Sequence, residues 1–147
     1  MLTRQSLCCI ISIIGIIPIL NGENMSKQKA LVYDIICNSP RHMNASEIYD
    51  LAKEKLPNIS FGTVYRNLNV LVQDGDIMRI AIDKCPDRFD KNPMAHHHMI
   101  CTKCGNVIDV FKDDSNDIRE IEEHMGAQIT EYIISMKCIC KQCLQMD

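Results

Sequence analysis

The segment AHHHMICTKCG, residues 95–105, holds three histidines and two cysteines within nine consecutive positions. All five side chains can bind transition metals. Successive side chains of a β-strand point to opposite faces, so a strand here would place His96 and His98 on one face and His97 on the other. His96 and His98 could then bind one ion together. A run of surface histidines without a metal is the alternative.

A two-histidine clamp needs further ligands, and the chain offers carboxylates on both sides of it. Asp90 precedes the histidines, Asp109 follows them, and His42 lies in the first half of the chain. Mixed imidazole and carboxylate sites suit iron(II), manganese(II) or zinc, and they exchange their ions more readily than four thiolates do. These residues therefore indicate an exchangeable metal site.

Four of the nine cysteines form two C-x-x-C pairs, Cys101 with Cys104 and Cys140 with Cys143. In a reducing compartment such pairs indicate zinc binding, whereas a secreted disulfide framework has no reason to prefer this spacing. We therefore predict a tetrahedral zinc site with four thiolate ligands. Simple burial of the cysteines in a core is the alternative, and Cys138 is the competing ligand.

The first 24 residues differ in character from the rest of the chain. Arg4 precedes an apolar run over residues 7–20 that is short for a membrane span and has the plan of a signal peptide. Met25 is followed at once by the polar sequence SKQK, and the remainder is typical of a thiol-rich cytoplasmic protein. We interpret Met25 as the true first residue and residues 1–24 as a mis-assigned start. A real signal or anchor and an unusual first helix are the alternatives.

Charge divides the remaining chain into two parts. Residues 25–82 carry seven Lys or Arg and six Asp or Glu, whereas residues 83–147 carry eight and twelve. Because nucleic acid is polyanionic, we expect any nucleic acid to bind the nearly neutral first part. A solvated acidic face is the other explanation for the second part.

Helix signals recur three times in the first part. Residues 27–38 have apolar side chains at helical spacing. Asn44 and Glu47 have the spacing of a capping box at the start of a second helix. Ser60 can cap a third helix, and Gly75 lies just past its end. Three short helices with tight connections predict a helix-turn-helix core.

A two-stranded hairpin is expected after these helices. Apolar and polar residues alternate over residues 77–82, Pro86 falls in a turn, and residues 88–90 follow it. A hairpin after three helices predicts a winged helix.

The third helix of a winged helix enters the DNA major groove, so its polar face is the candidate DNA interface. Arg66 could pair with a guanine edge or a phosphate, and Tyr65 could contact a thymine methyl group. A polar solvent face on a small helical bundle is the alternative. The candidate DNA-binding residues are Ser60, Thr63, Tyr65, Arg66 and Asn67, with Asn69 on the same face.

The second part predicts a small α/β domain. Residues 96–101 and 106–111 have the pattern of strands on either side of the CTKCG knuckle, in which Gly105 permits a tight turn. Residues 113–125 predict a helix with acidic residues in its first turn, and residues 128–138 predict a further strand. The four-thiolate zinc site would tie this last strand, or the tail after it, to the knuckle.

The chain resembles the ferric uptake regulator (Fur) family of bacterial metal-responsive repressors, and within it the peroxide-sensing PerR branch. The resemblance spans about Ser26 to Cys143, and it rests on the ordered segments ASEIYDLAKEKLPNISFGTVYRNLNVL, DRFD, HHHMICTKCGNVIDV and CKQC. It implies an α+β fold, with a winged helix-turn-helix DNA-binding domain at residues 25–90 and a small α/β metal-binding dimerisation domain at residues 91–147. It also implies a cytoplasmic homodimer that binds double-stranded operator DNA, with no membrane association and no enzymatic activity.

The resemblance also assigns metal ligands. It implies a structural zinc ion at Cys101, Cys104, Cys140 and Cys143. It implies a regulatory iron(II) or manganese(II) ion between the two domains at His42, Asp90, His96, His98 and Asp109. Asp90 favours the peroxide-sensing branch, because iron-sensing relatives tend to carry glutamate there and zinc-sensing relatives often carry cysteine. An iron, manganese or zinc uptake regulator of the same family is the alternative.

Peroxide sensing in the resembling proteins depends on oxidation of a ligand histidine at iron(II), which here points to His42 or His96. Losing that ligand would open the hinge between the domains and derepress the target genes. His97 and His124 lack a full ligand set, and Cys85 lies alone at the wing turn, so we interpret these three residues as non-ligands.

Two other classes of protein fit some of these features. A zinc-ribbon interaction or metal-storage protein would account for the cysteines, but it would not need the Tyr65 and Arg66 helix face. An exported metalloenzyme would account for the apolar leader, but no water-activating glutamate stands beside the histidines as in H-E-x-x-H.

Overall fold

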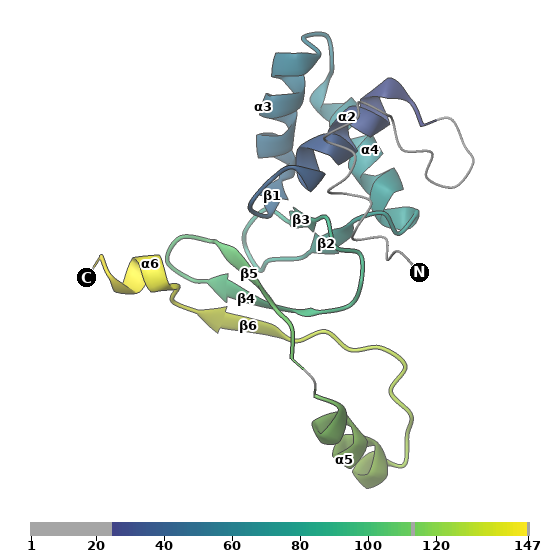
Figure 1. Cartoon of the computed structure of the whole chain (residues 1–147), viewed down its shortest axis with the longest axis vertical. Coiled ribbons are helices and arrows are strands. Elements are labelled where there is room, and N and C mark those ends of the chain that lie inside the picture. The colour runs from purple at the N-terminus through teal and green to yellow at the C-terminus, as the bar shows by residue number, and fades with distance from the viewer. Residues whose placement is uncertain (1–24, 113, 147) are drawn as a thin grey trace. The chain divides into compact units, whose positions relative to one another are not determined.

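The computed structural model describes residues 25–112 and 114–146, so the interpretation of residues 1–24 lies outside the described part. The chain divides into two compact units (Figure 1), unit 1 ending at Pro93 and unit 2 beginning at Met94. Each unit has its own helices and its own sheet. Among the described residues, no helix is long and apolar enough to cross a membrane.

The described part of unit 1 contains three helices, α2 (Lys27–Cys37), α3 (Ala45–Lys55) and α4 (Phe61–Gln73). Each begins after a polar N-cap whose side chain accepts a hydrogen bond from a backbone N–H three residues on. The predicted capping box is confirmed. Glu47 N donates to Asn44 Oδ1 at 2.9 Å, and Asn44 N donates to Glu47 Oε2 at 2.8 Å. Gly75, with φ of 71°, follows α4 as predicted.

A small antiparallel sheet completes unit 1. Its strands, in the order β1-β3-β2, are β1 (Met43–Asn44), β3 (Arg88–Asp90) and β2 (Met78–Ile80). The predicted hairpin corresponds to β2 and β3, although β2 is shorter than the alternation over residues 77–82 indicated. β1 pairs Met43 with Phe89 and Asn44 with Arg88. This pairing brings the chain around His42 alongside β3, and together with the three helices it gives the predicted winged helix.

One face of α4 holds the core of unit 1 together. Val64, Leu68 and Leu71 are completely buried on this face. They pack in a cluster with apolar residues of α2, α3 and β3, among them Val32, Ile36, Ile48, Ala52 and Phe89. Because α4 is anchored along this apolar stripe, its opposite face is presented to solvent.

Unit 2 is built on three strands, β4 (His97–Cys101), β5 (Val107–Val110) and β6 (Ser135–Cys138). β4 lies in the middle, antiparallel to β5 and parallel to β6. The two predicted strands flanking the knuckle are therefore confirmed as β4 and β5. Gly105 adopts φ of 69° in the turn between them, which a residue with a side chain rarely adopts.

The predicted strand over residues 128–138 is wrong in its first half. Residues 127–134, all of them described, form neither helix nor strand. The parallel ladder begins at the pair His98 and Ser135, and Ile134 is the last residue before it to bond to β4, accepting from His98 N at 3.0 Å. Because β4 starts only at His97, residues 127–133 have no strand partner among the residues that the structure describes.

Two helices accompany this sheet. The predicted helix is α5 (Ser115–Met125), which ends at Gly126 in the left-handed conformation, with φ of 63°. Figure 1 shows α5 beyond the end of the three strands, and all eleven of its residues, which the structure describes, are exposed or only partly buried. A short helix that the sequence did not predict, α6 (Lys141–Leu144), follows β6.

Candidate metal centres and DNA interface

Four cysteine sulfurs converge in unit 2. Cys101 ends β4, Cys104 lies in the knuckle, and Cys140 and Cys143 lie at the start of α6 and within it. Their sulfur atoms all lie within 4.8 Å of one another, with Cys104 Sγ and Cys140 Sγ 3.7 Å apart. A tetrahedral zinc ion with Zn–S bonds of about 2.3 Å needs sulfurs about 3.8 Å apart. The predicted four-cysteine cluster is confirmed, and its spacing fits a structural zinc ion.

The pKa values of these thiols differ widely, and binding of a cation would reconcile them. Cys140 N donates to Cys101 Sγ at 3.3 Å, and this bond together with the backbone N–H of Cys104 lowers the pKa of Cys101 to about 6. Hydrogen bonds with Cys104 and Cys140 raise the pKa of Cys143 to about 12. The thiol of Cys101 therefore ionises readily, whereas that of Cys143 stays protonated because its S–H takes part in hydrogen bonds with the neighbouring sulfurs. A divalent cation at the centre of the cluster would stabilise all four thiols in the ionised, thiolate form.

Cys138, the competing ligand, lies outside this cluster. It is paired with Cys101 across the parallel β4 and β6 ladder. Burial raises the pKa of the Cys138 thiol, so this residue stays protonated more readily than an ordinary cysteine. Cys85 is exposed in the connection between β2 and β3.

His96 and His98 lie side by side, with ring centroids 4.4 Å apart. Both face the same carboxylate. Asp109 Oδ1 is 3.3 Å from His96 Nε2 and 3.8 Å from His98 Nε2. Atoms bound to one ion at about 2.0–2.2 Å stand at such separations from each other. Strand pairing explains the convergence, because His98 is opposite Asp109 in the β4 and β5 register.

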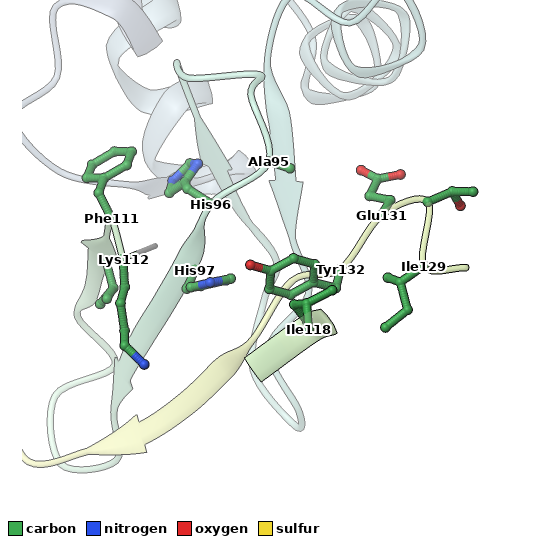
Figure 2. A pocket seen from close by; sticks show the side chains of 11 residues that line it. Ala95, His96, His97, Phe111, Lys112, Ile118, Ile129, Glu131 and Tyr132 are labelled. Carbon is green, nitrogen blue, oxygen red and sulfur yellow. The ribbon is translucent and has the colours of Figure 1, made fainter. Parts of the chain in front are cut away.

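The ring of His96 is oriented by the backbone. His96 Nδ1 is 2.7 Å from the carbonyl oxygen of Met94, and since a carbonyl only accepts, Nδ1 carries the proton. This contact turns Nε2 toward Asp109. Phe111 stacks on the ring of His96, with ring centroids 5.0 Å apart (Figure 2). An imidazole oriented beside a carboxylate suits a divalent metal of the iron, manganese or zinc type.

His97 has different partners. Its Nε2 is 2.8 Å from Asp114 Oδ2, its Nδ1 accepts from Ile134 N at 3.2 Å, and Tyr132 packs against its ring, as Figure 2 shows. Lys112 Nζ lies 2.7 Å from the other oxygen of Asp114, and this contact lowers the pKa of that carboxyl group. His97, Tyr132 and Lys112 line part of a pocket of about 590 Å³. The alternation of the strand thus separates His97 from His96 and His98.

Unit 1 contains the other two predicted regulatory ligands. His42 directly precedes β1 and Asp90 ends β3. His42 Nε2 lies 3.5 Å from Asp90 Oδ2, and only 11% of the His42 side chain and 3% of the Asp90 side chain are exposed. β1 and β3 are paired through Met43 and Phe89, which accounts for this proximity. A histidine and a carboxylate this close are a suitable donor pair for one metal ion.

The solvent face of α4 carries the predicted DNA-binding residues in two groups. Tyr65 and Arg66 are exposed. The remaining three have local hydrogen bonds: Ser60 Oγ accepts from Thr63 N at 3.1 Å, and Asn67 Nδ2 donates to Thr63 O at 2.9 Å. Ser60, Thr63 and Asn67 therefore have roles in forming the start of the helix as well.

The sequence profile described as the ferric uptake regulator family matches residues 21–137 of the chain. This match extends over most of both units and includes every predicted regulatory ligand. The chain belongs to the ferric uptake regulator family. The resemblance inferred from its motifs is confirmed.

Individual relatives of this Fur-family chain include peroxide sensors. The peroxide-responsive repressor PerR of Staphylococcus aureus (strain USA300) is 30% identical over 123 residues, which are 83% of this chain and 83% of the relative. The structure of the Helicobacter pylori ferric uptake regulator Fur matches with a TM-score of 0.77 at 26% identity, covering 97% of this chain and 95% of that one. The Campylobacter jejuni peroxide stress regulator matches with a TM-score of 0.66 at 29% identity, covering 79% and 88%.

Sequence reasoning missed two groups of residues around the sites of this Fur-family chain. Asp114 was noted only as part of an acidic helix start, but its side chain binds His97. Glu47 was identified as a capping residue, and it also binds Arg41 and Arg88, with Oε1 and Oε2 at 2.6 and 2.7 Å. These partners are up to 41 positions apart in the sequence, and no local pattern indicates them.

Proposed function

We propose that the chain is a metal-dependent, peroxide-responsive transcriptional repressor that binds operator DNA as a cytoplasmic homodimer. Membership of the ferric uptake regulator family supports the regulatory role. The names of the Staphylococcus aureus relative and of the Campylobacter jejuni structure support the response to peroxide. Neither unit needs an enzymatic activity in this role.

The observation that carries the proposal is the convergence of His96 and His98 on Asp109, at 3.3 and 3.8 Å. Unit 1 offers a second donor pair, His42 and Asp90, 3.5 Å apart. We propose that one regulatory ion takes ligands from both pairs. Such an ion would favour one arrangement of the two units, and DNA with two half-sites binds only a dimer of matching geometry.

Dimer formation through unit 2 is supported by its apolar surface. Ile121 and Met125 of α5 are 49% and 68% exposed, and Ile133 and Ile134 before β6 are 46% and 43% exposed. Exposed apolar side chains gathered in one small unit are characteristic of surfaces that a partner covers. A second copy of the same chain satisfies this requirement in a symmetric dimer.

Peroxide sensing needs iron(II) rather than manganese(II) at the regulatory site. Iron(II) held by these residues would catalyse the two-electron oxidation of a ligand histidine by hydrogen peroxide, in which one peroxide oxygen is added to the imidazole ring and the other leaves as water. His42 and His96 are the two candidates. The oxidised ring is a poorer ligand, so the chain would lose the arrangement that binds DNA and the target genes would be derepressed.

Mass spectrometry of the iron-loaded protein before and after brief exposure to hydrogen peroxide tests this mechanism. We expect one additional oxygen atom on His42 or His96, and none on either when manganese replaces iron. Met43, Met94 and Met99 lie close by in the sequence, so fragment ions must locate the oxygen on the imidazole. Oxidation confined to cysteines, with zinc release, would contradict the mechanism. Metal-dependent DNA binding without histidine oxidation would instead identify a metal uptake regulator of the same family.

Replacing Arg66 with alanine should weaken binding to the promoter of the protein's own gene. An arginine contact to a base edge or phosphate contributes about 1–3 kcal/mol, so we expect about a tenfold to hundredfold loss of affinity in a gel-shift titration. Arg119→Ala on α5 is the matched control, because it removes the same charge from an exposed position of unit 2. Equal binding by both variants would argue against the α4 interface, and absence of binding by the wild-type protein would favour a metal-storage role.

A further inference from the structure

The guanidinium group of Arg88 joins three parts of unit 1. Arg88 Nη1 donates to Glu47 Oε2 at 2.7 Å and to the backbone oxygen of His42 at 3.3 Å. Arg88 is itself the first residue of β3, the strand that ends at Asp90. Arg88 therefore connects the two proposed metal ligands: it lies on the strand of Asp90, and its side chain binds the backbone of His42.

Glu47 holds this guanidinium in place. It lies in the first turn of α3, where Asn44 N donates to Glu47 Oε2 at 2.8 Å and Arg41 Nη1 donates to Oε1 at 2.6 Å. Burial raises the pKa of Glu47, but the hydrogen bonds from Asn44 and Arg41 and the charge of Arg88 outweigh it, so the pKa lies below its usual value. The carboxylate is therefore ionised at neutral pH and available to both arginines.

His42 lies one residue before the ladder that joins β1 to β3. The ladder between these strands begins at Met43, which is opposite Phe89. The bond from Arg88 to the His42 carbonyl extends the attachment to β3 by that one residue. The Arg88 side chain is only 17% exposed, so water competes little for this contact.

We propose that Arg88 is a positioning residue for the metal site, fixing the backbone of His42 at the distance from Asp90 at which both can bind one ion. The inference rests on the proposed regulatory metal and deepens it. Residues that orient metal ligands without touching the metal typically account for a factor of about 10–100 in metal affinity. Through Glu47, the same clamp ties this half of the site to the start of α3, the helix that precedes α4.

Titration of the zinc-loaded, full-length protein with manganese(II) tests the inference. Arg88→Met keeps the apolar stem but removes both hydrogen bonds, and we expect about tenfold or greater loss of manganese affinity. Zinc content should not change, because Arg88 lies in the other unit from the four cysteines. Arg88→Lys keeps a donor and the charge, so it should recover most of the affinity. If Arg88 were needed only for folding, manganese affinity would not fall from wild type through Arg88→Lys to Arg88→Met while the zinc content stayed equal.

Arg41→Met is the matched control. Arg41 also binds Glu47, but its side chain is 56% exposed and its bond goes to Oε1, away from the His42 carbonyl. We expect wild-type manganese affinity for this variant. Equal affinities for Arg88→Met and Arg41→Met would overturn the inference while leaving the proposed function intact, whereas a wild-type protein that binds no manganese would overturn both.

If Arg88→Met does not fold, Glu47→Gln provides the test. Glutamine can still accept the hydrogen bond from Asn44 N and keep the capping box, but it loses the ion pairs with Arg88 and with Arg41, the second of which Arg41→Met tests separately. We expect a smaller loss of manganese affinity in the same direction. Wild-type affinity in this variant would overturn the inference.

Discussion

Replacing Cys104 with serine should leave the protein without bound zinc and unfold unit 2. Cys104 is exposed, so the serine itself disturbs little. The loss comes from the metal, because a structural zinc ion contributes an apparent 10–16 kcal/mol in zinc-finger peptides, more than the total stability of about 5–15 kcal/mol of an ordinary domain. Unit 2 begins at Met94 and is small, and small units gain much of their stability from such a metal. Zinc content and thermal unfolding followed by circular dichroism measure the two effects.

Cys138→Ser is the matched control for this prediction. Cys138 is opposite Cys101 in the sheet but lies outside the four-sulfur cluster. We expect it to keep one zinc ion per chain and to unfold within a few degrees of the wild-type protein, since a small change at a partly buried thiol costs about 1 kcal/mol or less. Full zinc occupancy in Cys104→Ser, or equal loss from both variants, would show that the metal is held by a different set of thiols.

The zinc cluster could be predicted from the sequence because its signal is local. A C-x-x-C pair fixes two sulfurs on one turn of chain, and only the meeting of the two pairs depends on the fold. The starts of α3 and α4 were predictable for the same reason, because Asn44 and Ser60 bond to residues three positions on. The separation of His97 from its two neighbours followed from strand geometry alone.

Features that depend on distant residues could not be predicted in the same way. β1 is only two residues long, and it forms because Met43 meets Phe89 across the unit. The stretch before Ser135 has the composition of a strand, and it lacks strand structure because β4 begins only at His97. The bond between Arg88 and Glu47 likewise depends on how β3 approaches α3. The β-strand propensity of a segment shows that it can form a strand, but whether it does so depends on a neighbouring strand with which it can pair.

Replacing Asp109 with asparagine should abolish operator binding at manganese concentrations that saturate the wild-type protein, while leaving the structural zinc in place. Asp109 Oδ1 is the atom that both His96 Nε2 and His98 Nε2 face, so this change removes the shared anionic donor from the proposed regulatory site. Asparagine has nearly the same shape, and the side chain of Asp109 is 30% exposed, so the fold should tolerate it. Because even residues that only orient metal ligands account for factors of about 10–100, we expect about a hundredfold or greater loss of manganese affinity.

The matched control is Asp117→Asn, which makes the same isosteric change at an exposed position of α5, where 71% of the side chain is accessible. It should bind manganese and operator DNA as the wild-type protein does. Gel shifts with and without manganese, at fixed ionic strength, separate two explanations for weak DNA binding by Asp109→Asn. If excess manganese restores the complex, the carboxylate acts by binding the ion. If the variant binds manganese normally and still fails on DNA, then Asp109 acts on the arrangement of the protein and the regulatory ion has other ligands.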